Sequence, residues 1–486
     1  MILKNNIFRV RPVLGDLKGL WNTYTIWADK SYTYTLEEQS YGISMWSTLY
    51  IKEGINVNFD SYRRMCVYGK LIIQGRSDNP VIFIGNGNGI KIVNGGEVIA
   101  NYLKIKRADI NCDGNAALYV ATNGKLDINN SEIDNAYYGI NIASGENINI
   151  NNTTIINCDQ RGINIDKDSL GHGNVTITNS HISNSLYGIY VNDLASSGII
   201  SENNTITDLR YTGIYIYRHQ YGDFRVKNNT VYRAIQPIVI QANDISSSLL
   251  LLNIENNEIS SDYYNGIKLA GILTIDNDLT LPKSKYIYDH IIINKGSTLE
   301  IQPGTILLSA NGGGIGVYGK LVAYGVKDNP IVLSSTYDPD YYKWRSDTSW
   351  GYIYADSIGE INANNMKIKY GSFYIEGSLN MMNCKIMNST GTGVIFNTDI
   401  QPIFHYNTFV GNDIAVENRN DNIMIDASYN YWDSVYGPSI YIPIYNPKTK
   451  KWKNIWSGDG DRIIGNIYYE PFLGQEITQA LQYNQE

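Results

Sequence analysis

Acidic and basic residues recur a few positions after a repeated Gly-Ile pair, and their types suit acid–base chemistry. Four to six residues after the glycines at 162, 188 and 213 come Asp166, Lys167, Asp193, Arg218 and His219. If successive copies stack as neighbouring strands about 4.8 Å apart, equivalent side chains one or two copies apart lie roughly 5 or 10 Å from each other. Those separations bracket the carboxylate spacings of retaining and inverting glycosidases. Asp166, Asp193 and Arg218 are therefore candidate catalytic residues, and a solvated loop edge of mixed charge is the alternative.

Aromatic residues outside the regular repeats are the second group of candidates. They are Tyr341, Tyr342 and Trp344 in one loop, and Trp452 and Trp456 in an insertion, 440–458, that also holds Lys448, Lys450, Lys451 and Lys453. Flat aromatic faces bind the apolar faces of sugar rings, and lysines suit an acidic glycan or a protein partner. We predict that these five aromatic residues contact a glycan, with ordinary loop packing as the alternative. Packing is the prediction for Trp350 and Trp432, and Asp338, Asp340 and Asp347 form a second acidic group beside the first loop.

The sequence contains no motif typical of a metal or cofactor site. The five histidines show no metal-ligand spacing, and neither a phosphate-binding glycine loop nor a Gly-x-Ser-x-Gly elbow is present. The sequence therefore predicts no metal and no cofactor. The four cysteines (Cys66, Cys112, Cys158 and Cys384) form no C-x-x-C pair, so buried thiols and a Cys112–Cys158 bridge both stay open.

Charge and hydropathy narrow the class of protein. The 486 residues carry a net charge of −8, with 18% charged residues and 40 Tyr. Binding to a nucleic-acid backbone needs a basic surface, so we expect no nucleic-acid partner. No apolar run approaches the length of a membrane-spanning helix. The first ten residues also lack a secretory signal, which favours a virion protein over a secreted protein whose signal has been removed.

A repeat of 22 to 29 residues must position the candidate residues. Gly-Ile pairs begin at Gly139, Gly162, Gly188 and Gly213, and an Asn-(Asn/Ser/Thr) pair precedes each pair by nine or ten residues. In Gly-Ile-x-Val the aliphatic side chains alternate, as in a strand with one buried face. Asn and Gly tolerate the left-handed backbone of tight corners, and stacked Asn amides can bond from coil to coil. This pattern predicts an all-β parallel β-helix, with each repeat forming one coil.

A second, longer repeat predicts two tandem β-helix units. Residues 48–84 match residues 298–334 at a constant offset of 250, with 13 identities, among them Val67-Tyr-Gly-Lys-Leu71 and Val317-Tyr-Gly-Lys-Leu321. We expect an N-terminal cap or anchoring segment over 1–47, units over 48–274 and 275–473, and a tail over 474–486.

The motifs of the second unit resemble those of a known group. In order they are Leu299-Glu-Ile-Gln-Pro-Gly304, Val317-Tyr-Gly-Lys-Leu321, Gly325 to Pro330-Ile331, Trp350-Gly-Tyr-Ile353, Asn430-Tyr-Trp432, Gly437-Pro438, and Gly460-Asp461 to Leu473. The chain resembles the right-handed parallel β-helix repeat proteins, the broad pectate-lyase-like group. The first unit departs from the pattern, with Glu53 where proline is usual. The group includes lyases, glycosidases, adhesins and phage tailspikes, so the resemblance implies the fold more than the activity.

The predicted fold, the N-terminal residues and the composition together lead to three expectations of function. The first is a tailspike or tail-fibre-like protein on a virion surface, similar in composition to proteins of archaeal viruses, that binds a host-surface glycan or glycoprotein. Its N-terminal segment would contact other tail or baseplate proteins, and a homo-oligomer is common among such proteins. The second is a polysaccharide lyase or endoglycosidase, and the third is a cell-surface or secreted adhesin.

Overall fold

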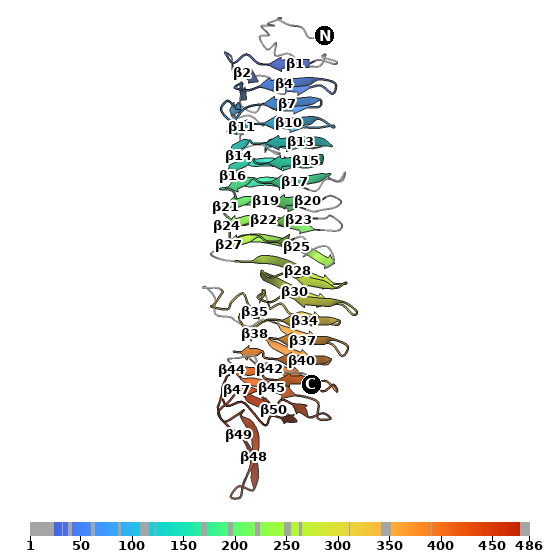
Figure 1. Ribbon diagram of the computed structural model, residues 1–486, viewed down its shortest axis with the longest axis vertical. Coiled ribbons are helices and arrows are strands. Elements are labelled where there is room, and N and C mark those ends of the chain that lie inside the picture. The colour runs from blue at the N-terminus through green and yellow to red at the C-terminus, as the bar shows by residue number, and fades with distance from the viewer. Residues whose placement is uncertain are drawn as a thin grey trace. The chain divides into compact units, whose positions relative to one another are not determined.

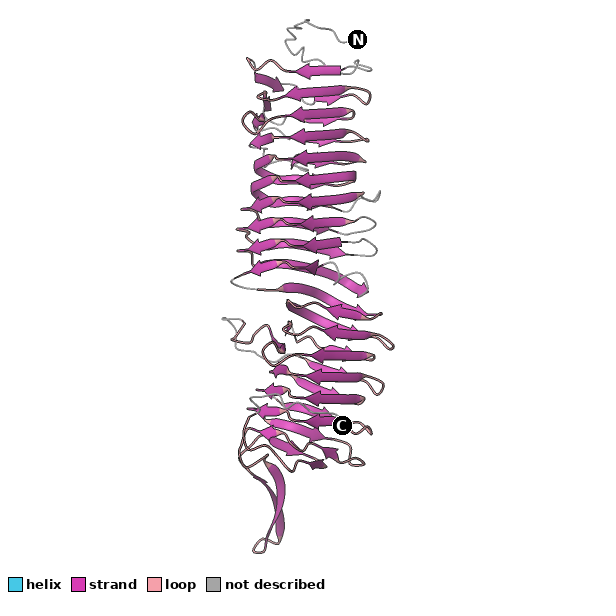
Figure 2. Ribbon diagram, viewed as in Figure 1, coloured by secondary structure: helices cyan, strands magenta, loops and turns pink. Residues whose placement is uncertain are grey.

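The structure, a computed structural model, describes most of the chain. The described residues are 24–31, 33–36, 41–59, 64–85, 89–106, 116–121, 123–166, 173–192, 198–218, 224–246, 254–261, 265–310, 312–341, 351–389 and 391–476. Within these ranges every regular element is a strand, as Figure 2 shows. None of these residues belongs to a helix long and apolar enough to cross a lipid bilayer. The prediction of an all-β chain is confirmed.

The chain divides into two compact units. Unit 1 comprises residues 1–238 and 256–262, and unit 2 comprises residues 239–255 and 263–486. The motif-based boundaries after residues 47, 274 and 473 stay predictions. Tyr24–Trp27 pairs with Thr48–Ile51, so part of the segment 1–47 forms a strand of the first sheet.

Unit 1 is a stack of three-sided coils whose strands pair in parallel with their equivalents one coil away (Figure 1). The first sheet runs β1 (Tyr24–Trp27), β4 (Thr48–Lys52), β7 (Lys70–Gln74), β10 (Glu97–Asn101), β13 (Gly124–Asn129), β15 (Gly145–Asn151), β17 (Asn174–Thr178), β20 (Ile199–Glu202) and β23 (Phe224–Lys227). The second side runs β2 (Thr33–Leu36), β5 (Asn56–Phe59), β8 (Val81–Gly85), β11 (Leu103–Lys106), β14 (Glu132–Ile142), β16 (Thr154–Ile165), β18 (His181–Ser183), β21 (Thr205–Thr207), β24 (Thr230–Tyr232) and β27 (Glu258–Ser260). The third side runs β3 (Tyr41–Ile43), β6 (Met65–Val67), β9 (Ile90–Ile92), β12 (Ala116–Val120), the second halves of β14 and β16, β19 (Tyr187–Asn192) and β22 (Thr212–Arg218).

Unit 2 repeats this construction and adds a hairpin. Its first sheet runs β29 (Leu279–Leu281), β31 (Thr298–Ile301), β34 (Lys320–Tyr324), β37 (Glu360–Asn364), β40 (Ser378–Met382) and β43 (Ile403–His405). The other sides hold β28 (Ile267–Ile275), β30 (Lys285–Ile293), β32 (Ile306–Ser309), β33 (Ile315–Val317), β35 (Ile331–Ser335), β36 (Tyr352–Ala355), β38 (Met366–Lys369), β39 (Ser372–Ile375), β41 (Lys385–Met387), β42 (Thr392–Phe396), β44 (Thr408–Val410), β45 (Ile414–Asn418), β47 (Tyr431–Trp432) and β50 (Arg462–Ile464). Two separate pairs are β46 (Ile425–Asp426) with β51 (Ile467–Tyr468), and the antiparallel hairpin of β48 (Ile440–Asn446) with β49 (Lys451–Ser457). Two further strands are β25 (Gln236–Ser246) and β26 (Ile254–Glu255).

The sequence offset of 250 corresponds to equivalent local structure in the two units. β4, β6, β7 and β8 of unit 1 correspond to β31, β33, β34 and β35 of unit 2. Gly54 and Gly304 both have a left-handed backbone, and a side chain at either would collide with the amide of Asn79 or Asn329. The same turn is therefore built twice from the same residues.

The core is a column of aliphatic side chains from alternate strand positions. In β19 Ile189 and Val191 are fully buried, whereas Tyr190 between them faces outward, as the alternation predicts. The glycine of each Gly-Ile pair allows close stacking: a Cβ at Gly188 would lie 2.5 Å from the carbonyl oxygen of Gly213 in the next coil. Of the predicted packing tryptophans, Trp432 is fully buried and stacked on Phe409 with ring centroids 4.9 Å apart, which confirms the prediction. Trp350 lies outside the described residues.

Left-handed residues end the strands of the first sheet, mostly asparagines. They are Tyr102, Asn130, Asn152, Asn179, Asn203 and Asn228 in unit 1 and Asn365, Asn383 and Tyr406 in unit 2, with φ between 46° and 58°. Asparagine adopts this backbone at lower cost than other residues with a Cβ. The prediction that asparagine turns the corners is confirmed.

The residue after each of these corners is buried, and where it is polar it forms a hydrogen-bonded ladder from coil to coil. Asn204 Oδ1 accepts the backbone N–H of Ser180 at 2.9 Å, and Asn229 Oδ1 accepts the N–H of Asn204 at 3.1 Å. Each amide also donates to a strand carbonyl, Asn204 to Ile177 O and Asn229 to Ser201 O, both at 2.8 Å. Buried backbone groups at the corner are thereby satisfied from one coil to the next.

Unit 2 uses the same ladder. Asn407 Oδ1 accepts the N–H of Cys384 at 3.0 Å, and Asn430 Oδ1 accepts the N–H of Asn407 at 2.7 Å. Both asparagines are fully buried.

Cys158 and Cys384 are buried free thiols, and burial raises the pKa of each to about 12. Cys112 lies outside the described residues.

Replacing a ladder asparagine tests this account of stability. Asn229→Ala leaves the N–H of Asn204 and the carbonyl of Ser201 without their side-chain partners, and we expect a loss of about 2–4 kcal/mol in the free energy of unfolding. The neighbouring Asn228→Gly is the control, because glycine adopts the same left-handed backbone. Chemical denaturation should show a much lower midpoint for Asn229→Ala than for Asn228→Gly, and equal midpoints would contradict the ladder's role.

Candidate functional site

The structure places one of the three predicted catalytic residues. Asp166 follows β16, and its half-buried carboxylate accepts a hydrogen bond from Asn164 Nδ2 at 2.5 Å. Arg161 lies 3.7 Å away as an ion-pair partner. Asp193 lies outside the described residues, and so does the side chain of Arg218, whose backbone ends β22. The predicted carboxylate pair of Asp166 and Asp193 stays a prediction, as do Lys167 and His219 beside it.

The first predicted aromatic group is described only at Tyr341. Its ring is half-buried and, like the side chain of Ile306, packs against a buried cluster of Ile287, Leu308 and Ala310. Burial raises the pKa of Tyr341. Tyr342 and Trp344 lie outside the described residues, so their contact with a glycan stays a prediction.

The nearby acidic group is partly buried and paired. Asp338 is almost fully buried, accepts the Ser334 hydroxyl at 2.7 Å and lies 3.2 Å from the Lys369 ammonium. Lys369 also pairs with Asp340. In this arrangement the Asp338 and Asp340 carboxylates anchor a turn against β38, and Asp347 lies outside the described residues.

The second predicted aromatic group lies on the hairpin of β48 and β49. The ring of Trp456 contacts that of Tyr441, with centroids 4.7 Å apart, and the Arg462 guanidinium lies 5.0 Å from the Trp456 ring. Trp452 pairs in register with Tyr445, but its own side chain is outside the described part. Tyr441 and Tyr445 are exposed, so the hairpin presents aromatic rings to solvent. Glycan contact by Trp452 and Trp456 stays a prediction.

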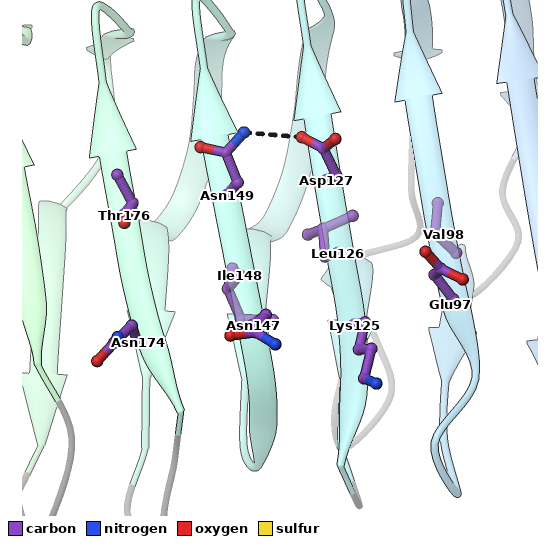
Figure 3. A pocket seen from close by; sticks show the side chains of 10 residues that line it. All are labelled: Glu97, Val98, Lys125, Leu126, Asp127, Asn147, Ile148, Asn149, Asn174 and Thr176. Carbon is purple, nitrogen blue, oxygen red and sulfur yellow. Dashed lines mark hydrogen bonds between the residues drawn. The ribbon is translucent and has the colours of Figure 1, made fainter.

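The outer face of the first sheet of unit 1 carries a shallow polar hollow of about 450 Å³ (Figure 3). Asp127 lies in it and accepts hydrogen bonds from Asn149 Nδ2 at 2.7 Å and Asn129 Nδ2 at 2.8 Å. In Figure 3 Glu97 and Lys125 lie on the neighbouring strands β10 and β13. Each is ion-paired, Glu97 with Lys70 and Lys125 with Glu146. The charges of this face are thus largely satisfied within the sheet.

A continuous aromatic surface lies on another side of unit 1. We name it the tyrosine platform, and it consists of Tyr138, Arg161, Tyr187, Tyr190, Tyr211 and Tyr215. Strand register produces it: Tyr138, Arg161 and Tyr187 occupy equivalent positions in three successive coils. Tyr190 and Tyr215 are likewise equivalent in the next two strands, β19 and β22.

Arg161 lies at the centre of the tyrosine platform. Its guanidinium carbon is 3.6 Å from the centroid of the Tyr190 ring, 5.6 Å from that of Tyr138 and 5.8 Å from that of Tyr187. The guanidinium also donates to Asn164 Oδ1. Cation–π contacts of this kind orient the rings around a fixed positive charge.

The rings of the platform pack on one another and stay accessible. Tyr190 and Tyr215 are stacked, with centroids 4.8 Å apart and planes 11° apart. Tyr187 meets Tyr190 and Tyr211 edge-on at 5.0 and 5.5 Å. Tyr211 is 40% exposed, and the other four rings are partly exposed. Neighbouring rings restrict each other's rotamers, so the platform is ordered before any ligand arrives.

Burial raises the pKa of three platform tyrosines, Tyr138, Tyr187 and Tyr215. For Tyr215 burial and the neighbouring hydroxyls, Tyr190 first, raise the pKa to about 12. Tyr138, Tyr187 and Tyr215 therefore offer neutral rings with hydroxyl donors at any pH near neutrality.

Such a surface suits a ligand with both an apolar face and hydroxyl groups. Flat rings cover the C–H face of a sugar, while tyrosine hydroxyls and the Arg161 guanidinium can bond to its oxygens. Asp166 lies at the edge of this surface through its contact with Arg161. The sequence prediction missed the platform because its aromatic candidates lie outside the regular repeats, whereas the platform lies within them. The signal was the third position of the Gly-Ile-x-(Val/Ile) strands, which is Asn at 141 and 164 and changes to Tyr at 190 and 215.

Comparison with known proteins agrees with this geometry. Residues 82–243 and 116–279 each match the family model described as a right handed beta helix region. The fold is a right-handed parallel β-helix. No curated protein and no solved structure matches the chain.

Within the described part of this β-helix, no cluster of three or more His, Cys, Asp or Glu side chains could hold a metal ion. One carboxyl group nevertheless has an unusual environment. Asp461 is buried, and burial raises its pKa to about 6, although Asn412 donates to it from its backbone N–H at 3.0 Å and from its side chain at 2.7 Å.

The position of Asp461 explains this pKa. It continues a ladder in which Asn412 Oδ1 accepts the N–H of Ser389 and Asn412 Nδ2 donates to Ile386 O. An aspartate therefore occupies the next step after an asparagine, where its charge is poorly solvated. Asp433 raises the pKa further by repulsion.

Replacing this aspartate by asparagine should stabilise the β-helix at neutral pH. Because the folded-state pKa of about 6 exceeds the ordinary 3.8, wild-type stability falls as pH rises from about 4 to 6 and then stays level. We expect Asp461→Asn to be about 1–3 kcal/mol more stable than wild type at pH 7 and nearly equal to it at pH 3.5. Thermal melts at the two pH values measure this, with the exposed Asp413→Asn as control; a destabilised variant at pH 7 would contradict the assignment.

Proposed function

We propose that this β-helix is a virion attachment protein of the tailspike or tail-fibre type that binds a host-surface glycan through the tyrosine platform. The observation that carries the proposal is the ring cluster around Arg161, with Tyr190 at 3.6 Å from the guanidinium and stacked on Tyr215. An ordered, partly exposed aromatic surface on a rigid scaffold is an arrangement suited to binding a polysaccharide without large rearrangement.

The chemistry of the platform favours a glycan over an apolar ligand. Five hydroxyl groups and a guanidinium accompany the rings, so a purely apolar partner would bury polar groups without hydrogen bonds. The Arg161 charge is shared with Asp166 at 3.7 Å, which lowers its attraction for a strongly anionic polymer. A sugar chain rich in hydroxyl groups satisfies both requirements.

The location, the partners and the oligomeric state are part of the same proposal. The protein would stand on the virion surface, with the segment 1–47 contacting other tail or baseplate proteins and with identical chains associating as a homo-oligomer. The aromatic hairpin of β48 and β49 and the loop of Tyr341, Tyr342 and Trp344 would provide further contacts with the host glycan or glycoprotein.

Removing the stacked pair tests the proposal. Asparagine is accommodated at the equivalent strand positions 141 and 164, so Tyr190→Asn with Tyr215→Asn should fold normally. We expect roughly tenfold or greater loss of affinity for host envelope polysaccharide, because two aromatic contacts worth about 0.5–1.5 kcal/mol each are removed.

The matched control is Tyr119→Asn, which lies in the same column outside the platform. Adsorption of the purified chain to host cells and to isolated polysaccharide would be measured for all three proteins. Unchanged adsorption of the double variant, with an unchanged melting temperature, would refute binding at the platform.

A second candidate function is cleavage of the bound polysaccharide. The supporting observation is the position of the Asp166 carboxylate beside Arg161, at the edge of the platform. In that case Asp166→Asn should abolish the release of new reducing ends and of unsaturated uronates, while binding persists. The isosteric Asp127→Asn, on the first-sheet face, is the control. Full cleavage by Asp166→Asn would remove the residue from consideration, and no cleavage by wild type would leave an attachment protein.

A further inference from the structure

The regular stack of unit 2 is interrupted on one side, and a hollow of about 360 Å³ lies there. β43 is the last strand of the first sheet of unit 2, and the following β46 pairs with β51 instead of with β43. The hollow is lined by Asn380, Met382, Ile403, His405, Tyr406, Asp426, Ser428 and Tyr429. Its volume falls in the range of about 300–1,000 Å³ that is usual for small-molecule sites.

Two stacked tyrosines with an unfavourable backbone form one wall of this hollow. Tyr406 and Tyr429 have φ of 58° and 60°, and their ring centroids are 5.6 Å apart with planes 26° apart. The corners that precede Tyr406 on this side of unit 2 hold Asn365 and Asn383, which adopt the same backbone at lower cost. Tyr406 and Tyr429 therefore occupy two consecutive corners where asparagine would adopt the backbone at lower cost. Backbone strain of this kind concentrates at ligand sites.

Polar groups in the hollow are held in defined orientations. His405 Nδ1 lies 3.0 Å from the backbone carbonyl of Ser428. A carbonyl only accepts, so Nδ1 carries the hydrogen and, in the neutral ring, Nε2 is the acceptor. One oxygen of Asp426 accepts the N–H of Ser428 at 3.0 Å, and the second oxygen adds a further acceptor.

We infer that this hollow is a second saccharide-binding site, for one or two pyranose rings of an uncharged sugar chain. The stacked faces of Tyr406 and Tyr429 would cover the C–H face of a ring, since flat aromatic groups and apolar sugar faces match in shape. His405 and Asp426 would accept its hydroxyl protons, and Asn380 supplies an amide that both donates and accepts. The Asp426 carboxylate disfavours acidic sugars by repulsion.

This site is independent of the tyrosine platform. The platform is built from unit 1 and the hollow from unit 2, so each can bind or fail alone. If both sites bind the same polysaccharide, one protein molecule holds it at two points. Binding at the first site then raises the effective concentration of the polysaccharide at the second.

The experiment is hydroxyl-radical footprinting of the full chain, read residue by residue by mass spectrometry. The probes are short neutral oligosaccharides of glucose, galactose, mannose or N-acetylglucosamine, with oligogalacturonate as the acidic comparison. We expect at least one neutral probe to protect Tyr406 and Tyr429 from oxidation while oligogalacturonate does not. No protection of these residues by any neutral probe would overturn the inference, and so would equal protection by oligogalacturonate.

The same experiment separates this inference from the proposed function. Protection of Tyr187, Tyr190 and Tyr211 alone would support the platform and overturn the second site. Protection of Tyr406 and Tyr429 alone would support the second site and count against the platform. Each result is read from different peptides, so one failure cannot hide the other.

A variant pair completes the test. Tyr406→Asn with Tyr429→Asn places the residue of the neighbouring corners at both positions, so the chain should melt at the same or a higher temperature than wild type. Affinity for the protecting oligosaccharide at this site should fall roughly tenfold or more. Tyr370→Asn is the matched control, because Tyr370 has φ of 62° but does not line the hollow. An unchanged affinity of the double variant, in a chain that melts normally, would overturn the site.

Discussion

Hydrogen bonding at the corners of the coil is the constraint on which the rest of the structure depends. The chain turns a corner after each short strand of a coil. Each corner buries backbone N–H and C=O groups that cannot reach water. The chain solves this with two adjacent residues: one that takes the left-handed backbone, such as Asn203, and one whose buried amide bridges the coils, such as Asn204. The frequent Asn-Asn, Asn-Ser and Asn-Thr pairs of the sequence are the chemical form of this solution.

Once the corners and the aliphatic column are fixed, the outward positions are free to vary. One strand position of successive coils in unit 1 holds buried asparagine at 141 and 164 and partly exposed tyrosine at 190 and 215, and the residues on either side are buried Ile or Val in every case. The tyrosine platform and the polar first-sheet face are both such columns. A β-helix thus separates stability from recognition: the inside is repetitive, and a binding surface arises where a few successive coils place compatible side chains in register.

Much of the fold could be predicted from the sequence, because its causes are local and repeated. The Gly-Ile pairs, the corner asparagines and the offset of 250 each reflect a requirement that recurs in every coil or unit. The tyrosine platform was harder, because its members are 23 to 26 positions apart in sequence and become neighbours only when the coils are aligned. The hollow of His405 and Tyr406 depends on the interruption between β43 and β46, which no local pattern marks. The pKa of Asp461 depends on burial beside Asn412, which sequence spacing does not reveal.

The stacking of coils also determines how the molecule responds to force. Within each unit the strands of a coil are hydrogen-bonded to the equivalent strands of the coils before and after it. A pull on the last coil would break these rows one after another, so that the protein peels and does not rupture as a whole. Each coil of 22 to 29 residues that comes free would add roughly 70–105 Å of extended chain. Such stepwise lengthening dissipates work, so the stack would lengthen in increments under a steady pull.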